Sequence, residues 1–110
     1  MIPLRVAAII RIVCNLAQVS EIDLLGSRRE RRLAWPRMIA YWLIREHTSL
    51  SWPQIAAVFN RDHTTVLQGA RRIAELRETN AEVRKLLLLA SERLCAPSAY
   101  PAGLTAGLVP

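Results

Sequence analysis

A chain of 110 residues fits a single domain with a small hydrophobic core and leaves no room for a second core of that size. Its 52% hydrophobic residues exclude disorder over the whole chain, while its apolar segments are too short, or too often broken by proline and glycine, to cross a membrane. The net charge is +6 and 14 of the 15 cations are arginine, which indicates a polyanion as the binding partner.

The first predicted element is a helix over residues 3–18, because its apolar residues recur at helical spacing and would form one face of the core. Ser20 can then cap a short helical turn, residues 21–25, which Gly26 would end. The segment 28–32 that follows has four arginines, one glutamate and no apolar residue. Such a segment cannot pack inward, so we expect a basic loop on the surface.

An amphipathic helix is predicted to begin at Pro36, because proline fits the first turn of a helix. Its apolar residues recur three and four positions apart and are expected in the core: Trp35, Met38, Ile39, Trp42 and Leu43. The tryptophans could instead form a stacking platform for single-stranded nucleic acid, but their helical phase with Ile and Leu favours the core. Arg37 lies outside this phase, so we expect it to be exposed.

Residues 51–73 carry the pattern of two helices joined by a tight turn. Ser51 can cap the first helix, and Pro53 fits its first turn. Asn60 and Arg61 remain as the turn, since asparagine tolerates the left-handed conformation that a tight turn needs. The sequence therefore predicts a helix-turn-helix, in which the second helix reads the major groove of DNA.

The second helix is predicted to begin at His63, with Asp62 as its N-cap. Its buried stripe would be Val66, Ala70 and Ile73. Asn80 can cap a last helix, which would close the bundle over the helix-turn-helix. The predicted fold is all-α: a small helical bundle containing a helix-turn-helix with a basic loop, formed by residues 1–95. Residues 96–110 are uncharged and rich in proline and glycine, so we expect a flexible tail, with a docking peptide as the alternative.

Neither a metal nor a cofactor is expected. Cys14 and Cys95 form no C-x-x-C motif, and two histidines 16 residues apart make no zinc pattern. We expect both cysteines to be reduced, packed thiols of a cytoplasmic protein. The apolar N-terminus superficially resembles a signal peptide, but Arg11 and Asn15 interrupt it, so it is predicted to be a mature helix.

Three segments together resemble the C-terminal DNA-binding domain of the bacterial chromosomal replication initiator DnaA: residues 61–66 (Arg-Asp-His-Thr-Thr-Val), the basic run 28–32, and residues 34–37 (Ala-Trp-Pro-Arg). The resemblance spans roughly residues 5–95. It implies that a monomer binds double-stranded DNA in the nucleoid, at a short asymmetric box of the TTATNCACA type. No Gly-x-x-x-x-Gly-Lys-Ser/Thr phosphate loop occurs in the sequence, so we expect a stand-alone reader without the ATPase module and without a bound nucleotide.

The resemblance places Arg29 in the minor groove, where a narrow groove attracts a guanidinium. It also gives Arg37 a contact to the DNA near the reading helix. Glu30 stands where the family commonly has a small polar residue, and a carboxylate there would weaken binding or shift the preference. In the reading helix, threonine methyl groups can meet thymine methyl groups, His63 can bond to a base edge or a phosphate, and Asp62 can accept from a cytosine amino group. The full set of expected DNA contacts is Arg28, Arg29, Arg31, Arg37, Arg61, Asp62, His63, Thr64, Thr65, Gln68, Arg71 and Arg72.

An enzyme would have to use Asp62 and His63, but adjacent helical residues do not face each other, and no nucleophile stands at a suitable spacing. The leading hypothesis is therefore a sequence-specific DNA-binding protein that regulates transcription or replication, of mobile-element or prophage origin or in competition for the initiator's sites. The alternative is an adaptor that binds the replication machinery without specific DNA contact.

Overall fold

The computed structural model describes residues 2–28 and 30–95, and within them the backbone forms six α-helices and no strand. The helices are α1 (Leu4–Ala17), α2 (Glu21–Leu25), α3 (Arg31–His47), α4 (Trp52–Phe59), α5 (His63–Thr79) and α6 (Ala81–Cys95). The all-α prediction is therefore confirmed. The predictions for Arg29 and for the tail, residues 96–110, lie outside the described residues.

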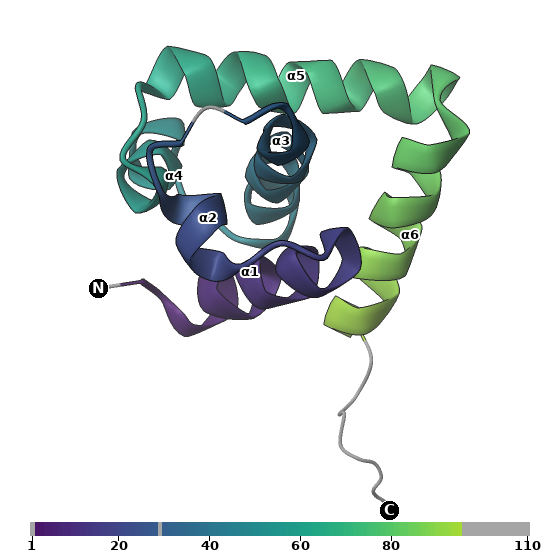
Figure 1. Ribbon diagram of the computed structural model, residues 1–110, viewed down its shortest axis with the longest axis horizontal. Helices are drawn as coiled ribbons and strands as arrows, with labels where there is room; N and C mark the ends of the chain where they lie inside the picture. The colour runs from purple at the N-terminus through teal and green to yellow at the C-terminus, as the bar shows by residue number, and fades with distance from the viewer. Residues whose placement is uncertain (1, 29, 96–110) are drawn as a thin grey trace, which may run out of the picture.

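Helix α3 lies at the centre of the bundle and is seen nearly end-on in Figure 1, with α5 above it and α1 below it. The core is built around this helix. Its fully buried side chains include Leu33, Leu43 and Ile44 of α3, Ile9 and Ile10 of α1, Ile55 and Phe59 of α4, and Val66 and Ile73 of α5. Helix α6 packs against α1 and α5 on the side away from α4 (Figure 1), so it closes the bundle at the far end of α5 and not over the turn.

The predicted N-caps are confirmed by hydrogen bonds from backbone N–H groups. Ser20 Oγ accepts from Asp23 (3.0 Å), Ser51 Oγ from Gln54 (3.3 Å), Asp62 Oδ2 from Thr64 (2.9 Å), and Asn80 Oδ1 from Glu82 and Val83 (2.9 and 3.1 Å). The Gln54 side chain also accepts from the Ser51 N–H at 2.8 Å, which completes a capping box. These local bonds satisfy donors that a helix start otherwise leaves free.

The prediction for α3 was wrong about its first residue and about the exposure of Trp35; Arg37, also predicted wrongly, is described with the site below. The helix begins at Arg31, five residues before the predicted start, and Pro36 lies inside it. The earlier start follows from Leu33, which is fully buried and anchors the first turn in the core. Ile39 and Leu43 are buried as predicted and Met38 and Trp42 pack partly against the core, but Trp35 is 38% exposed.

Both cysteines are free thiols, but only Cys14 is packed. Burial, aided by the negative charge of Glu21, raises the pKa of the Cys14 thiol to about 11, so it stays protonated at neutral pH. Cys95 is exposed, contrary to expectation. Among the described residues, none of the helices combines the length and the apolar character needed to cross a membrane.

Candidate nucleic-acid interface

The turn before α5 adopts the predicted helix-turn-helix geometry. Asn60 is left-handed, with φ 52° and ψ 49°, and its N–H caps α4 by donating to the carbonyls of Ala56 and Ala57. The N–H of Arg61 donates to the Ala56 carbonyl at 3.0 Å. Asp62 follows at once as the N-cap, so α5 begins at His63, as predicted. The chain thus changes direction within the three residues between α4 and α5, and these bonds fix the angle between the two helices.

The side chains at the start of α5 are free to contact a ligand. Asp62, His63, Thr64, Thr65 and Gln68 are all exposed, whereas the predicted stripe of Val66, Ala70 and Ile73 is buried. The structure therefore brings these five polar residues together on one open surface. Because Asp62 already caps the helix start with a carboxylate, what this surface offers a ligand is a set of side-chain donors and acceptors, which suits the edges of bases.

Gly69 sets how closely α5 packs on α3 at the point where the two helices cross. A Cβ atom at this position would lie 3.0 Å from Met38 Cγ and 3.0 Å from Tyr41 Cδ2, closer than ordinary packing distance. The absent side chain therefore lets α5 sit close on α3. Beside this crossing lies an open hollow of about 380 Å³, lined in part by Thr65 and Gln68. The polar side chains of Thr65 and Gln68 thus border a largely apolar hollow on the α3 side of α5.

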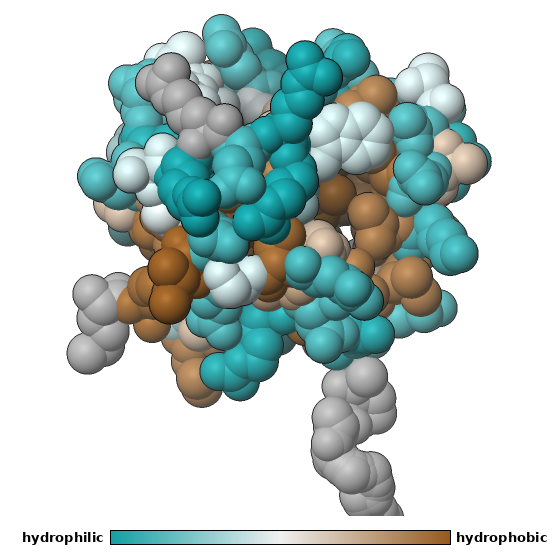
Figure 2. Space-filling view, viewed as in Figure 1, coloured by the Kyte–Doolittle hydropathy of each residue, from teal (hydrophilic) through white to brown (hydrophobic). Residues whose placement is uncertain are grey.

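Two acids, Asp23 of α2 and Glu30 of the basic run, hold two of the arginines of that run. Arg32 pairs with Asp23 at 3.1 Å and with Glu30 at 2.9 Å, and Arg28 pairs with the same two carboxylates at 3.7 and 3.0 Å. The hydrogen bond from Arg32 holds the pKa of the Asp23 carboxyl below its ordinary value. Glu30 Oε2 is shut off from solvent, and its 3.0 Å contact with Arg28 Nε is an ion pair without hydrogen-bond geometry. Figure 2 shows hydrophilic side chains gathered around this start of α3.

Replacing Glu30 with serine should therefore strengthen binding to duplex DNA several-fold. The change removes one of the two carboxylates that hold Arg28 and Arg32, so that these arginines can more easily turn to phosphates, and serine is itself a good N-cap for α3. If one additional phosphate is neutralised, the slope of log K against log salt should become steeper by about 0.9. Titrations at several salt concentrations measure both effects.

The matched control is Glu78→Ser, which removes the same charge from the Arg77–Glu78 pair at the other end of α5. It should leave both the affinity and the slope nearly unchanged. An equal gain in the two variants would mean that net charge, and not the release of the loop arginines, governs binding.

Arg37 is buried, so the prediction that it is exposed was wrong. Only 7% of its surface is accessible, and its guanidinium donates to backbone carbonyls near the end of α2. The physical reason is the central position of α3: a helix packed on several sides buries more than one stripe, so a residue outside the main stripe need not face solvent. Arg61 is half-buried, and its guanidinium donates to the carbonyls of Gly26 at 2.7 Å and Phe59 at 3.3 Å.

Three further arginines of the expected set lie on the surface. Arg31 and Arg71 are exposed, and Arg72 is exposed beside Glu75 at 3.5 Å. Arg71 lines a second hollow of about 260 Å³ together with Arg45 and Trp52. The guanidinium of Arg45 stacks on the Trp52 ring, 4.7 Å from its centroid, and donates to the Leu50 carbonyl at 3.0 Å. We did not expect Arg45 at this surface; its closeness in sequence to the Ser51 cap was the available signal.

Comparison with known proteins agrees with this geometry. A family model described as the bacterial dnaA protein helix-turn-helix matches residues 6–73. The chromosomal replication initiator protein DnaA of Nostoc punctiforme is 38% identical over 88 residues, which cover 79% of this chain and 19% of that protein. The DnaA proteins of Rippkaea orientalis and Trichormus variabilis are each 36% identical, over 94 and 88 residues, covering 84% and 79% of this chain.

The match spans about a fifth of the length of these relatives. The region matched by the family model includes the basic run, the start of α3 and both helices of the helix-turn-helix, up to Ile73. The resemblance seen in the sequence is confirmed, and this chain belongs to the bacterial DnaA helix-turn-helix family.

Proposed function

We propose that residues 1–95 bind double-stranded DNA as a monomer, at a short asymmetric site like the box of the initiator, and that the chain regulates transcription or replication in the cytoplasm. The observation that carries the proposal is the start of α5, where five exposed polar side chains surround the positive end of a helix. Membership of the DnaA helix-turn-helix family supports the same conclusion. The relatives are named as chromosomal replication initiators.

We assign base reading to the first turns of α5. Thr64 and Thr65 would meet thymine methyl groups, His63 a base edge or a phosphate, and Asp62 a cytosine amino group while it caps the helix. Gln68, one turn further on, lines the hollow beside Thr65 and can reach the same groove. These contacts distinguish base pairs because each pair presents its own pattern in the major groove.

Arginine side chains would hold the phosphates on either side of the reading helix. The exposed candidates are Arg28, Arg31, Arg45, Arg71 and Arg72. Phosphate contacts of this kind position the protein and raise its affinity without reading sequence. For Arg29, the proposed minor-groove contact rests on the family pattern alone. Arg61 lies between the loop and the reading helix, and its role is considered below.

A gel shift tests the proposal directly. A duplex with an initiator-type box should bind on the order of 10³ times more tightly than a scrambled duplex at the same salt concentration. Equal binding of the two duplexes would show that the chain recognises DNA by charge alone. No binding to either duplex would leave the adaptor hypothesis.

Substitutions at the start of α5 should reduce discrimination between DNA sequences while leaving the stability of the fold nearly unchanged. Thr65→Ala and His63→Ala should each lower the discrimination between cognate and scrambled duplexes by roughly 1–3 kcal/mol. Their stability should change by no more than about 0.5 kcal/mol, because both side chains are exposed. Asp62→Ala should also cost about 1 kcal/mol of stability, since it removes the N-cap bond to Thr64.

Melting curves and titrations with both duplexes measure these effects. Thr79→Ala is the matched control, because it makes the same deletion at an exposed position at the other end of α5. It should keep full discrimination. Unchanged discrimination in both Thr65→Ala and His63→Ala would mean that this helix does not read bases.

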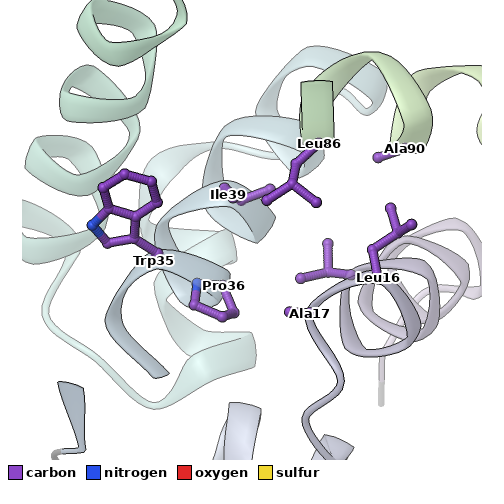
Figure 3. A pocket seen from close by; sticks show the side chains of 8 residues that line it. Leu16, Ala17, Trp35, Pro36, Ile39, Leu86 and Ala90 are labelled. Carbon is purple, nitrogen blue, oxygen red and sulfur yellow. The ribbon is translucent and has the colours of Figure 1, made fainter. Parts of the chain in front are cut away.

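The adaptor hypothesis has one observation in its favour, an apolar hollow between α1, α3 and α6. Its volume is about 110 Å³, and Leu16, Ile39 and Leu86 line it together with the half-exposed Trp35 (Figure 3). Figure 2 shows apolar side chains around a hollow in the same part of the surface. A hollow of this size accepts about one apolar side chain, so it could hold an anchor residue of a protein partner.

A further inference from the structure

We propose that Arg37 and Arg61 act together as a clasp that sets the position of residues 23–28 relative to the start of α5. The clasp consists of the two guanidinium groups and the carbonyl oxygens of Asp23, Leu24, Gly26 and Arg28. This inference rests on the proposed function, because the two elements that it joins are the basic loop and the reading helix. In this role the two arginines are positioning residues and do not themselves read DNA.

Four of the five N–H donors of the Arg37 guanidinium are bonded to backbone carbonyls. Its Nε donates to the Leu24 carbonyl at 2.9 Å and its Nη1 to the Arg28 carbonyl at 2.7 Å. Its Nη2 donates to the carbonyls of Asp23 at 2.7 Å and Gly26 at 3.0 Å. An arginine has five N–H donors, so at most one is left for a contact to DNA. With 7% of its surface accessible, Arg37 is largely built into the fold, and only an edge of it borders the hollow beside Thr65 and Gln68.

Two of the four acceptors of Arg37, the carbonyls of Asp23 and Leu24, lie in the last turn of α2, and a third belongs to its C-cap residue, Gly26. The last carbonyls of a helix have no intrahelical donor, and many helices satisfy them with a left-handed residue at the end. Gly26 instead has φ −79° and ψ −178°, an extended conformation. The Arg37 side chain takes over the missing C-cap bonds and places its positive charge at the negative end of the helix dipole.

Arg61 joins the same carbonyl to the helix-turn-helix. Its Nη2 donates to Gly26 at 2.7 Å across 35 positions of sequence, and its Nη1 donates to Phe59 at 3.3 Å. A carbonyl oxygen has two lone pairs, so Gly26 can accept from Arg37 and Arg61 at once. Since Arg61 directly precedes the N-cap of α5, this one oxygen ties the loop, α3 and the turn to a common point.

The clasp requires arginine at both positions. Burial lowers the pKa of the Arg37 guanidinium and the like charge of Arg61 lowers it further, but an arginine remains protonated in a protein. The nearby carboxylates of Asp23 and Glu30 are paired with Arg28 and Arg32. The two charges are therefore balanced chiefly by carbonyl dipoles. A lysine has one ammonium group with three donors, so it cannot span the same carbonyls.

For DNA recognition, the clasp would fix the position of the basic loop relative to the start of α5. A DNA-binding loop and a reading helix that enter neighbouring grooves must keep their relative position to within a fraction of an ångström. The clasp would provide this rigidity through guanidinium groups that are bonded to the backbone on both sides. Loosening it should leave α5 able to read its base pairs but should uncouple the loop from them.

The test uses Arg37→Lys, with Arg61→Lys as a second variant at a half-buried position that tolerates change better. Arg72→Lys, on the exposed face of α5, is the matched control. Amide hydrogen exchange should be at least about tenfold faster for Asp23 and Leu24, whose N–H groups are bonded to Ser20, in both clasp variants, and unchanged from Val66 to Ile73. In Arg72→Lys, both segments should exchange as in the wild-type chain.

Binding to a panel of single-pair variants of the box gives the second readout. The clasp variants should lose roughly tenfold in discrimination at the base pairs read from the minor groove and keep it at those read by α5. Inosine·cytosine pairs identify the first group, because they keep the minor-groove pattern of A·T while changing the major groove. Arg72→Lys should weaken all duplexes about equally.

Unchanged exchange at residues 23–28 in both clasp variants would overturn the proposal. So would equal losses at every base pair, which would indicate a general role in stability or a direct phosphate contact. If the wild-type chain shows no preference for the box, the proposed function fails, but the exchange experiment still decides whether the clasp holds the loop.

Discussion

Binding to duplex DNA should weaken about 500-fold when monovalent salt rises from about 50 to about 200 mM, if about five phosphates are neutralised and the slope of log K against log salt is near −4.5. The net charge of +6 and the exposed arginines along the loop, α3 and α5 provide the cations. The ion pairs of Arg28, Arg32 and Arg72 with neighbouring acids limit the number that can take part. The slope therefore reports how many phosphates the arginines neutralise, including those held by arginines that leave their acids.

Titrations of the box duplex at four or more salt concentrations give the slope. Arg45→Ala should make it shallower by about 0.9, because one phosphate contact is removed. Arg93→Ala is the control: this exposed arginine of α6 pairs with Asn15 at 2.7 Å, away from the proposed surface, and its loss should not alter the slope. A wild-type slope near zero would rule out DNA binding through this surface.

Phe59→Ala should lower the free energy of unfolding by about 3–5 kcal/mol. Phe59 is the last residue of α4, is 1% exposed, and meets the Tyr41 ring of α3 edge-on, with centroids 4.8 Å apart and planes at 85°. Its removal leaves a cavity at the point where the first helix of the helix-turn-helix is anchored to the core. Chemical denaturation followed by circular dichroism measures the loss.

Leu88→Ala provides the comparison, because it removes an apolar side chain of similar size that is 60% exposed on α6. Its effect should stay within about 0.5 kcal/mol. A loss of less than about 1 kcal/mol in Phe59→Ala would contradict the expected cavity term and would mean that the end of α4 is not part of the cooperative core.

Among the candidate site residues, those at the start of α5 could be located from the sequence, whereas those near the loop could not. Asp62 caps the helix and the residues after it are exposed, as predicted. Arg37 and Arg61 were expected to face DNA, but their guanidinium groups bind backbone carbonyls. An arginine looks the same in a sequence whether its donors meet phosphates or carbonyls, because the acceptors are brought to it by the fold.

The sequence by itself determined the helix-turn-helix. Ser51, Asn60 and Asp62 mark the start of α4, the turn and the start of α5, and all three act as predicted. This was possible because caps and tight turns depend on bonds between residues two to five positions apart, so the local sequence contains all the partners. The family could be identified as well, since one of the three segments that carry the resemblance, residues 61–66, lies at this turn.

Only the tertiary structure decided which arginines remain free for a ligand. The four carbonyls that hold Arg37 come from 9 to 14 positions away, and the one shared with Arg61 comes from 35 positions away. Helical periodicity could not reveal this, because it describes one buried stripe, while the number of buried faces depends on how many helices surround the element. Helix α3 is packed on several sides, so Arg37 is buried. Trp35, on the predicted core stripe, lines the hollow between α1, α3 and α6 and is therefore partly exposed.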